Sequence, residues 1–449
     1  MRLKLTALLL VMAMGILTAQ NKKWTLQECV EYAVENNLSI EQFELDLQAN
    51  LIDKSDALGN YLPNLNSSVT ASGNRGLSSD PITGQNFTAG IFTLGGNISS
   101  NVVLFNGMRN KNQMHRAKLN AIAGQYRLDD LKDDIRLQVA LNYLDVLSNK
   151  ESLKVFQAQY SATEQDLNRT KELVDSGVLP KGDLLQIEAT AANLEQQIVN
   201  AENQVLISRI TLAQLLQITD YENFEIADDV FEIPPSDILN NSAKSIFAKS
   251  VEFRNDIKLS ESSVELAEKD LDISKGARYP TLAAFFNYNT AYSSRKQFNP
   301  ATQSFSRVDL IDQFWLFDGI VYGGQLNIPI FNGFSTRNAI KRAEINVEKA
   351  KVRLEQDKLA LETTVNQAYV AVNNSFKSYE AAEKNVEARR LAYQYSKERY
   401  DVGLMNAFDF SQAQAQVDDA EANVIRTKYD YIFRLKVLEF YFGVPMNLE

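Results

Sequence analysis

The chain has 449 residues, of which 45% are hydrophobic and 23% charged, and its formal net charge is −11. This balance excludes a disordered chain, and the acidic surplus argues against nucleic acid as a partner. One His and one Cys exclude an internal disulfide, the common His/Cys metal clusters and a nucleophile–His pair. We therefore expect no enzyme activity, no cofactor, no metal and no catalytic residue.

The first residues have the composition of a secretory signal peptide. Arg2 and Lys4 precede an apolar run from Leu5 to Leu17, and Thr18-Ala19 provides the small residues of a cleavage site. We expect residues 1–19 to be removed on export. Beyond this segment, no stretch approaches the roughly 18 apolar residues that a membrane-spanning helix needs.

The first half of the chain is expected to contain a helix, a β-hairpin, a long helix and a shorter helix. Thr25 and Glu28 form a capping-box pattern at the start of the first helix, which we expect over 26–58. After Pro63, apolar and polar residues alternate with period two, which predicts a hairpin over 64–105. The two helices that follow are expected over 108–174 and 183–217.

An acidic segment over 219–242, which contains Pro234-Pro235, is expected to form an irregular equatorial linker. It separates two structural repeats, 20–218 and 243–449, whose elements follow the same order. In the second repeat these are a helix over 243–277, a hairpin over 281–331, a long helix over 334–400 and a short helix over 409–442.

A constant spacing relates the two repeats. Subtracting the positions of two glycines gives 333 − 107 = 226, and the same offset holds over some 80 residues. The pairs that obey it include Gly107 and Gly333, Tyr143 and Tyr369, Gly177 and Gly403, Asp183 and Asp409, and Gln186 and Gln412. An offset held without a gap over this length indicates an internal duplication.

The four predicted strands have the length and the alternation of outer-membrane barrel strands. Four strands cannot close a barrel, because eight is roughly the practical minimum. An open sheet in lipid would leave unpaired backbone groups at both edges, each costing several kcal/mol, so we expect the chain to share a barrel with copies of itself. The second hairpin loop holds the apolar cluster Phe314-Trp315-Leu316-Phe317, which we interpret as a membrane-edge belt or loop packing rather than a specific binding patch.

The predicted helices match one another in length. Each long helix spans about 67 residues, or about 100 Å, and two short helices end to end would have the same length. We therefore expect four rods of equal length per chain, two continuous and two made from halves. Val365, Tyr369, Val372, Phe376 and Tyr379 step by four and three residues, which predicts coiled-coil packing between the rods.

The order of these features resembles that of the TolC-like outer-membrane efflux proteins over essentially the whole mature chain. The features are the Leu26…Ala33…Asn36-Asn37 opening, the Pro-plus-strand segments, the two Phe-Asn-Gly joints (Phe105-Asn106-Gly107 and Phe331-Asn332-Gly333) and the two Gly-containing helix turns. The resemblance implies an α+β membrane protein with a long α-helical coiled-coil barrel and four transmembrane β-strands per chain. A homotrimer would close a 12-stranded barrel in the outer membrane, above a long periplasmic portion.

The resemblance also implies partners and a function. The chain would be the outer-membrane exit duct of a tripartite efflux pump or a type I secretion system. Its partners would be a periplasmic adaptor (membrane fusion) protein, an inner-membrane transporter of the RND, ABC or MFS type, and outer-membrane lipid. The alternative that we keep open is an outer-membrane-anchored coiled-coil structural protein or adhesin without transport. A stand-alone porin is disfavoured, because a pore needs no such helices.

Candidate functional residues follow from the same resemblance. The family contacts its adaptor at two helix turns, which correspond here to Gly177, Val178 and Leu179 and to Val402, Gly403 and Leu404. Turn geometry alone is the other explanation for these glycines.

The family's periplasmic gate pairs a tyrosine with an aspartate, and Tyr400 and Asp183 match these positions. Asp409 matches one ring of acidic residues at the constriction, while Gln412 replaces the second. Met405 stands where an arginine completes the family's latch, which argues against a salt-bridge latch there. Three like charges at Asp409 would favour cations.

Overall fold

The computed structural model describes residues 23–79, 86–227, 237–299 and 303–444, so the expected signal peptide lies outside the described residues. The chain divides into two compact units. The unit called here the helical unit comprises Met1–Leu45, Gln125–Leu259 and Glu355–Glu449. The other, called the sheet unit, comprises Asp46–Gly124 and Ser260–Leu354.

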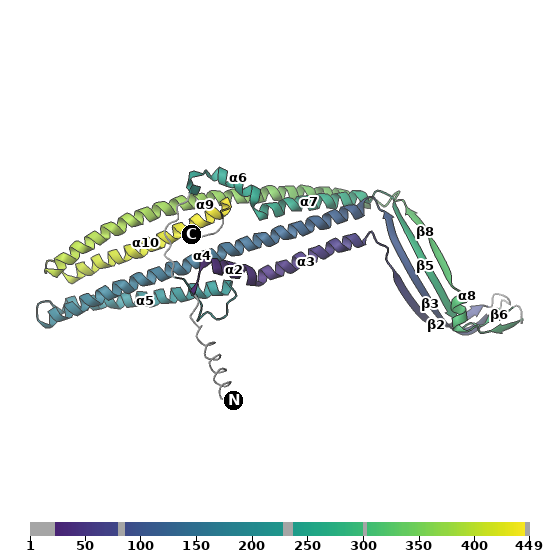
Figure 1. Ribbon diagram of the computed structural model, residues 1–449, viewed down its shortest axis with the longest axis horizontal. Coiled ribbons are helices and arrows are strands. Elements are labelled where there is room, and N and C mark those ends of the chain that lie inside the picture. Colours follow the sequence, from purple (N-terminus) through teal and green to yellow (C-terminus); the bar gives the residue numbers. More distant parts are fainter. Residues whose placement is uncertain (1–22, 80–85, 228–236, 300–302, 445–449) are drawn as a thin grey trace, which may run out of the picture. The chain divides into compact units, whose positions relative to one another are not determined.

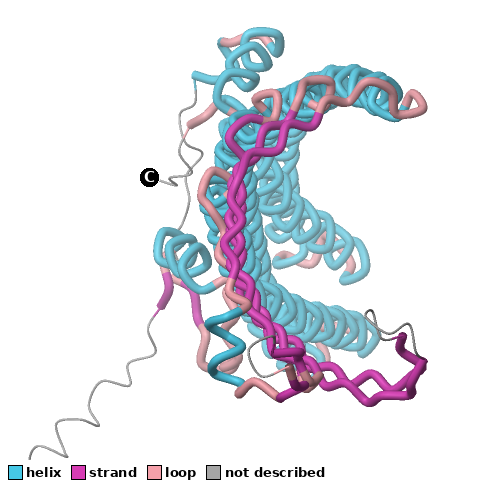
Figure 2. The backbone as a smooth tube through the Cα atoms, turned by 90° about the vertical axis from the view of Figure 1, so that its right-hand side faces the viewer, coloured by secondary structure: helices cyan, strands magenta, loops and turns pink. Residues whose placement is uncertain are grey.

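Four long strands form the centre of the sheet unit. They are β2 (Asn66–Ser79), β3 (Asn86–Phe105), β5 (Thr281–Ser293) and β8 (Gly319–Asn327). All neighbours are antiparallel, in the order β2-β3-β5-β8, so the two predicted hairpins lie side by side with β2 and β8 at the edges. Figure 2 shows the four strands as one curved sheet. A small hairpin of β6 (Gln297–Asn299) and β7 (Ser304–Ser306) follows β5 and was not predicted.

The strand register separates an apolar face of the sheet from a polar one. Side chains of paired residues lie on the same face, and Ile98 pairs with Tyr288, which pairs with Ile320. The apolar face carries Val69, Leu77, Phe92, Ile98, Phe286, Ile320, Tyr322 and Leu326, all of them exposed. On the polar face, the side-chain amide of Asn97 donates to the Asn289 amide oxygen at 2.5 Å. Period-two alternation in the sequence thus becomes a two-faced sheet.

Each long helix begins at a Phe-Asn-Gly joint. Helix α4 (Arg109–Asp175) and helix α9 (Ser335–Asp401) are both 67 residues long. Gly107 has a φ of 69°, and a Cβ there would lie 2.3 Å from the Gly276 carbonyl oxygen, so no other residue fits. The first joint therefore requires glycine both for its backbone conformation and for close packing.

Two of the predicted helices are broken in the structure. The helix expected over 26–58 is α2 (Leu26–Asn36) and α3 (Leu38–Gly59), and that over 243–277 is α6 (Ala243–Phe253) and α7 (Asn255–Gly276). Asn37 and Arg254, 217 residues apart, have extended backbones at these breaks. Asn37 donates to the carbonyl of Leu215 at 3.4 Å and accepts from the Ser39 amide at 2.9 Å, so its side chain replaces helix hydrogen bonds.

Within the helical unit, α5 (Lys181–Leu215) runs back along α4, and α10 (Ala407–Phe442) runs back along α9 (Figure 1). Of the predicted coiled-coil positions, Val365 and Val372 are fully buried, while Phe376 is partly exposed and packs on Tyr431 at 5.3 Å. Tyr143 is also fully buried, and its hydroxyl donates to the carbonyl of Trp24 at 3.2 Å. The core of this unit is therefore a seam between helices.

The expected linker is described in part. Its strand β4 (Glu225–Ile226) pairs in parallel with β1 (Lys23–Trp24), and a short 3-10 helix, η1 (Asp237–Asn240), precedes α6. The Phe224 ring lies 6.0 Å from that of Trp24, while the predicted Pro234-Pro235 lies outside the described residues. Among the described helices, none combines the length and the apolar composition needed to cross a membrane.

Candidate functional site at the two helix turns

The turns between α4 and α5 and between α9 and α10 share two backbone hydrogen bonds. Gly177 has a φ of 76° and Gly403 a φ of 77°. In the first turn the amide of Val178 donates to the Leu173 carbonyl at 2.8 Å, and in the second the amide of Leu404 donates to the Arg399 carbonyl at 2.8 Å. Each glycine amide also bonds a carbonyl three residues earlier. Both turns are Schellman motifs, in which glycine takes the left-handed position.

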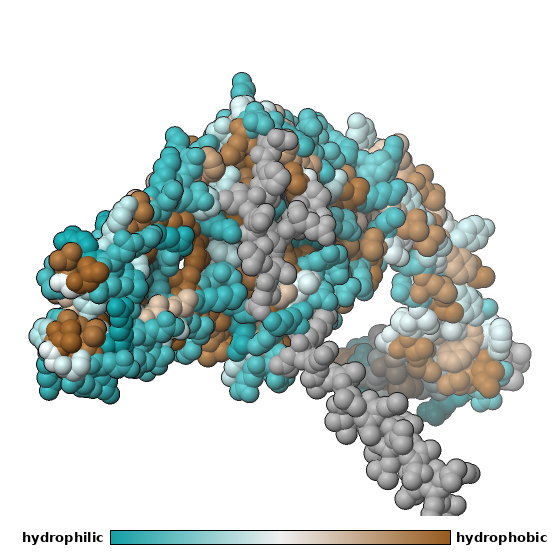
Figure 3. Space-filling model, turned by 60° about the vertical axis from the view of Figure 1, so that its left-hand side comes forward, coloured by the Kyte–Doolittle hydropathy of each residue, from teal (hydrophilic) through white to brown (hydrophobic). Residues whose placement is uncertain are grey.

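Turn geometry explains the glycines but not the residues beside them. Val178, Val402 and Leu404 are exposed, the last at 71%, and Leu179 is half-buried. Apolar side chains gather accordingly at both helix turns (Figure 3). Exposed apolar groups at the ends of two hairpins are typical of a surface that another protein covers.

The helix after the second turn begins with a polar cap. Asn406 accepts from the Asp409 amide at 2.8 Å and donates to the Asp409 carboxylate at 2.9 Å. The carboxylate of Asp409 therefore lies in the first turn of α10, where the helix dipole stabilises negative charge. Asp409 and Gln412 are both exposed. The first turn has Pro180 at the equivalent capping position.

Tyr400 packs into an aromatic stack at the end of α9. Its ring lies 4.5 Å from that of Phe410 and nearly parallel to it. Its hydroxyl lies 3.4 Å from the Thr170 hydroxyl on α4. Burial and then the negative charges of Asp183 and Asp166 raise the pKa of Tyr400, so its hydroxyl stays protonated. The charge of Asp183 contributes to this higher pKa, while the hydrogen bond between Asp183 and Tyr400 that the family resemblance implies stays a prediction.

Two ion pairs connect α4 to α9 near the turns. The ammonium of Lys397 lies 2.8 Å from the Asp166 carboxylate, and the Arg169 guanidinium lies 2.8 Å from the Asp401 carboxylate. Neither pair could be predicted from the sequence, because the partners are more than 230 positions apart and belong to no motif. The only sequence signal is that opposite charges occur near the ends of both long helices.

A carboxylate on α10 is buried beside this region. Asp418 is only 9% exposed, and burial, with the charges of Glu421 and Asp419, raises its pKa to about 7. Burial and the charges of Asp166 and Asp418 also raise the pKa of Tyr393. No pattern in the sequence indicates this higher pKa, because it depends on the burial of Asp418.

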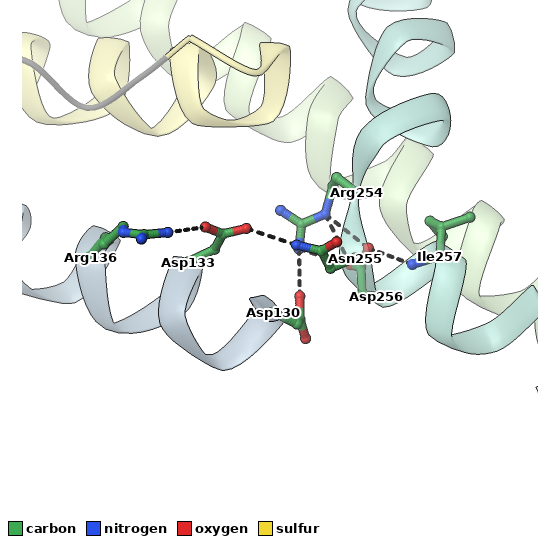
Figure 4. A network of polar contacts seen from close by, with 7 residues as sticks. All are labelled: Asp130, Asp133, Arg136, Arg254, Asn255, Asp256 and Ile257. Carbon is green, nitrogen blue, oxygen red and sulfur yellow. Dashed lines mark hydrogen bonds and ion pairs between the residues drawn. The ribbon is translucent and has the colours of Figure 1, made fainter. Parts of the chain in front are cut away.

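A second polar cluster surrounds Arg254, at the break between α6 and α7 (Figure 4). Its guanidinium bonds the Asp256 carboxylate at 2.8 Å and lies 3.7 Å from that of Asp130 on α4. Asn255 donates to Asp133 at 3.1 Å. Burial and neighbouring carboxylates raise the pKa of Asp130 to about 6. In the described part of the chain, no three acidic, His or Cys side chains are arranged to hold a metal ion. The contacts of Arg254 and Asn255 with Asp130 and Asp133 join the α6–α7 break to α4.

Comparison with known proteins gives matches along most of the chain. The family model described as "Outer membrane efflux protein" matches residues 30–216 and 249–444, and these ranges fall within the two expected repeats, 20–218 and 243–449. The outer membrane protein TolC of Vibrio cholerae serotype O1 is 22% identical over 303 residues. That match covers 68% of this chain and 66% of the relative, slightly less than two thirds of its length.

Solved structures give the same fold. The CmeC outer membrane channel of Campylobacter jejuni has a TM-score of 0.78 at 18% identity, covering 95% of this chain and 86% of that one. The outer-membrane channel OprN has a TM-score of 0.75 at 16% identity, covering 94% and 90%. VceC of Vibrio cholerae has a TM-score of 0.73 at 15% identity, covering 93% and 96%.

Proposed function

Because the chain belongs to the outer membrane efflux protein family, we propose that it forms the exit duct of a tripartite efflux pump or a type I secretion system. In this proposal a homotrimer spans the outer membrane, and its helices extend into the periplasm. A periplasmic adaptor and an inner-membrane transporter deliver the substrate. The chain itself catalyses no reaction, since its relatives are channels.

The two-faced sheet is the observation that carries the proposal. It has an apolar face suited to lipid and a polar face suited to a water-filled lumen. Its edges, β2 and β8, have no further strand beside them among the described residues. Pairing β8 of one copy with β2 of the next satisfies these edges, and three copies of this four-stranded sheet give a twelve-stranded barrel.

The helices support the assembly of several copies of the chain, independently of the sheet. On α9, Ile345, Val352 and Leu359 follow one another at steps of seven residues, and more than half of each side chain is exposed. A stripe of apolar residues with this period is typical of a coiled-coil seam without its partner. Leu51, Ile52 and Leu58 on α3 are exposed as well. Neighbouring copies would cover these seams and complete the wall of a tunnel.

We assign the two helix turns to adaptor contact and to gating. The exposed Val178, Val402 and Leu404 give an adaptor apolar side chains to contact. The ion pairs Lys397–Asp166 and Arg169–Asp401, together with Tyr400, hold the α9–α10 turn against α4. An adaptor that binds the open arrangement better than the closed one shifts the equilibrium toward opening.

The mass of the mature protein, extracted from outer membranes in mild detergent and corrected for bound detergent, tests the assembly. We expect three times the mass of one chain, and a monomer would overturn the shared barrel. Transport needs a separate test, namely accumulation of a fluorescent efflux dye in cells with and without the gene. The structural or adhesive alternative predicts a trimer in the first test and unchanged dye accumulation in the second.

A further inference from the structure

A short apolar helix, α8 (Leu310–Leu316), lies between β7 and β8 in the sheet unit. Five of its seven residues are apolar or aromatic. Ile311, Trp315 and Leu316 are exposed, Trp315 at 74%. A helix of seven residues that exposes three large apolar side chains to water is unfavourable unless something covers it.

The contacts of Gln313 hold α8 firmly to the sheet. Gln313 is 1% exposed and accepts from the Ser293 amide at 2.9 Å. Its own amide donates to the carbonyls of Ser293 at 3.1 Å and Val308 at 2.7 Å. The Thr290 hydroxyl donates to the Phe314 carbonyl at 2.7 Å. The apolar side of α8 is therefore presented in a fixed orientation.

The register places α8 on the apolar face of the sheet. Thr290 pairs with Gly96, and a Cβ on Gly96 would lie 3.3 Å from the Thr290 methyl group, so both point to one face. By strand alternation Tyr288 points to that face as well, which makes it the apolar face. Since Thr290 bonds the backbone of α8, the helix lies over this face, beside the far end of β5 in Figure 1.

The strand also gives the height of α8 along the sheet. The apolar face of β5 extends from Leu282 to Tyr292, which matches the 9–11 residues of a tilted membrane-spanning strand. Because Gln313 lies beside Ser293 and Phe314 beside Thr290, α8 descends toward the middle of this band. Its acidic first turn thus lies outward, and its second turn, with Trp315 and Leu316, lies inward.

We propose that α8 is an interfacial helix that inserts Trp315 and Leu316 at the headgroup–acyl boundary of the outer leaflet. This inference rests on the proposed barrel. A lipid surface fits better than a second copy of the chain, because copies meet at the edges of the sheet while α8 lies on its lipid-facing side. Asp309 and Asp312 stay at the level of the headgroups, and the indole of Trp315 occupies the position that aromatic belts favour.

Tryptophan fluorescence tests the proposal, because Trp24 and Trp315 are the only two tryptophans. The Trp24→Phe variant, assembled in vesicles whose acyl chains carry bromine at a shallow or a deep position, reports on Trp315 alone. We expect bromine at the shallow position to quench more than half of the Trp315 fluorescence. Bromine at the deep position should quench less of it, and iodide in the aqueous phase should quench little. Emission quenched by iodide but not by brominated lipid overturns the proposal. Emission shielded from both also overturns it, since that result would mean a protein partner.

Two further variants separate this inference from the barrel itself. The Trp315→Phe variant retains only Trp24, which lies in the helical unit and should not respond to brominated lipid. In a Trp24→Phe, Trp315→Phe background, Tyr322→Trp places a tryptophan on the apolar face of β8. If brominated lipid quenches this introduced tryptophan but does not quench Trp315, the barrel stands and the helix proposal falls. If neither responds, both proposals fall.

A spin label gives a second measurement that does not require replacing Trp24. Cys29 is fully buried and should stay unlabelled, so Trp315→Cys can be labelled selectively in the otherwise unchanged chain. We expect the label to be more accessible to oxygen, which dissolves in the bilayer, than to a water-soluble nickel complex. The reverse order of accessibility contradicts the proposal.

Discussion

The ammonium of Lys397 lies 2.8 Å from the carboxylate of Asp166, so that the last turns of α9 are joined to α4. The Asp166 side chain is only 14% exposed, so water screens this ion pair less than it screens a pair on the surface. We expect Lys397→Met to destabilise the closed arrangement of the α9–α10 turn by about 1 kcal/mol. This change corresponds to a roughly fivefold larger population of channels with the turn open. Single-channel conductance in planar bilayers measures this change.

The charge-swapped double variant, Lys397→Asp with Asp166→Lys, serves as the control for that prediction. It retains an ion pair at the same place and should restore the conductance of the original protein. Equal conductance in the single variant, the double variant and the original protein would show that this pair does not hold the turn closed.

Sequence patterns predicted the regular parts of this fold for physical reasons. Alternation shows which face of a strand meets apolar surroundings, and the 226-residue offset links Gly107 and Gly333 at the starts of α4 and α9. The broken helices could not be predicted, because the break at Asn37 depends on the Leu215 carbonyl, 178 residues away. Helix α8 was missed because side-chain contacts of Gln313, rather than periodicity, hold it in place.

In the candidate site, too, local features could be predicted from the sequence and contacts between distant residues could not. Glycine at both turns follows from local backbone geometry and can be identified in the sequence. The aromatic stack of Tyr400 on Phe410 and the ion pair of Arg169 with Asp401 depend on how helices align, so no local pattern indicates them. The adaptor-contact role of the turns rests on the family resemblance.

Leu404→Asp should abolish adaptor binding while leaving stability almost unchanged. The side chain is 71% exposed, so its replacement buries no charge and leaves no cavity in the chain itself. Site-specific cross-linking to the adaptor in cells should fall at least severalfold, and the thermal unfolding temperature should stay the same. Phe408→Asp, at an exposed apolar position beyond the turn, is the matched control. Equal cross-linking in Leu404→Asp and the original protein would remove the turn from the adaptor site.

Asp409→Asn should reduce the preference of the channel for cations. The substitution keeps an oxygen that can accept from the Asn406 amide group, now 2.9 Å from the Asp409 carboxylate, but removes the charge. In a trimer three charges disappear together, so the reversal potential in a salt gradient should move toward zero. Gln412 lies one helical turn away, and neither glutamine nor alanine carries a charge there. The Gln412→Ala variant should therefore leave the reversal potential unchanged. A reversal potential that is the same in all three proteins would exclude Asp409 from the constriction.

Arg254→Met should destabilise the helical unit by about 3 kcal/mol, since it leaves the surrounding carboxylates without their buried partner. The Arg254 side chain is 10% exposed, and both Asp256 and Asp130 lie within 4 Å of it. Denaturant unfolding of the detergent-solubilised protein measures the loss. Arg434→Met removes an arginine from an exposed pair with Asp430 and should cost much less. Similar losses in the two variants would mean that the Arg254 cluster has no special role at the helix break.

Asp418 should make the stability of the helical unit depend on pH. Its pKa in the folded chain is about 7, well above that of an unfolded aspartate, so the folded state binds the proton more tightly. Its contribution to stability is therefore fully present below about pH 4 and is lost as the pH rises through about 7. Asp418→Asn imitates the protonated form and should raise the unfolding temperature at pH 8 but hardly at pH 4. Asp419→Asn, at the exposed neighbouring position, should change the pH dependence far less. Parallel pH profiles for the original protein and Asp418→Asn would show that folding does not raise the pKa of Asp418.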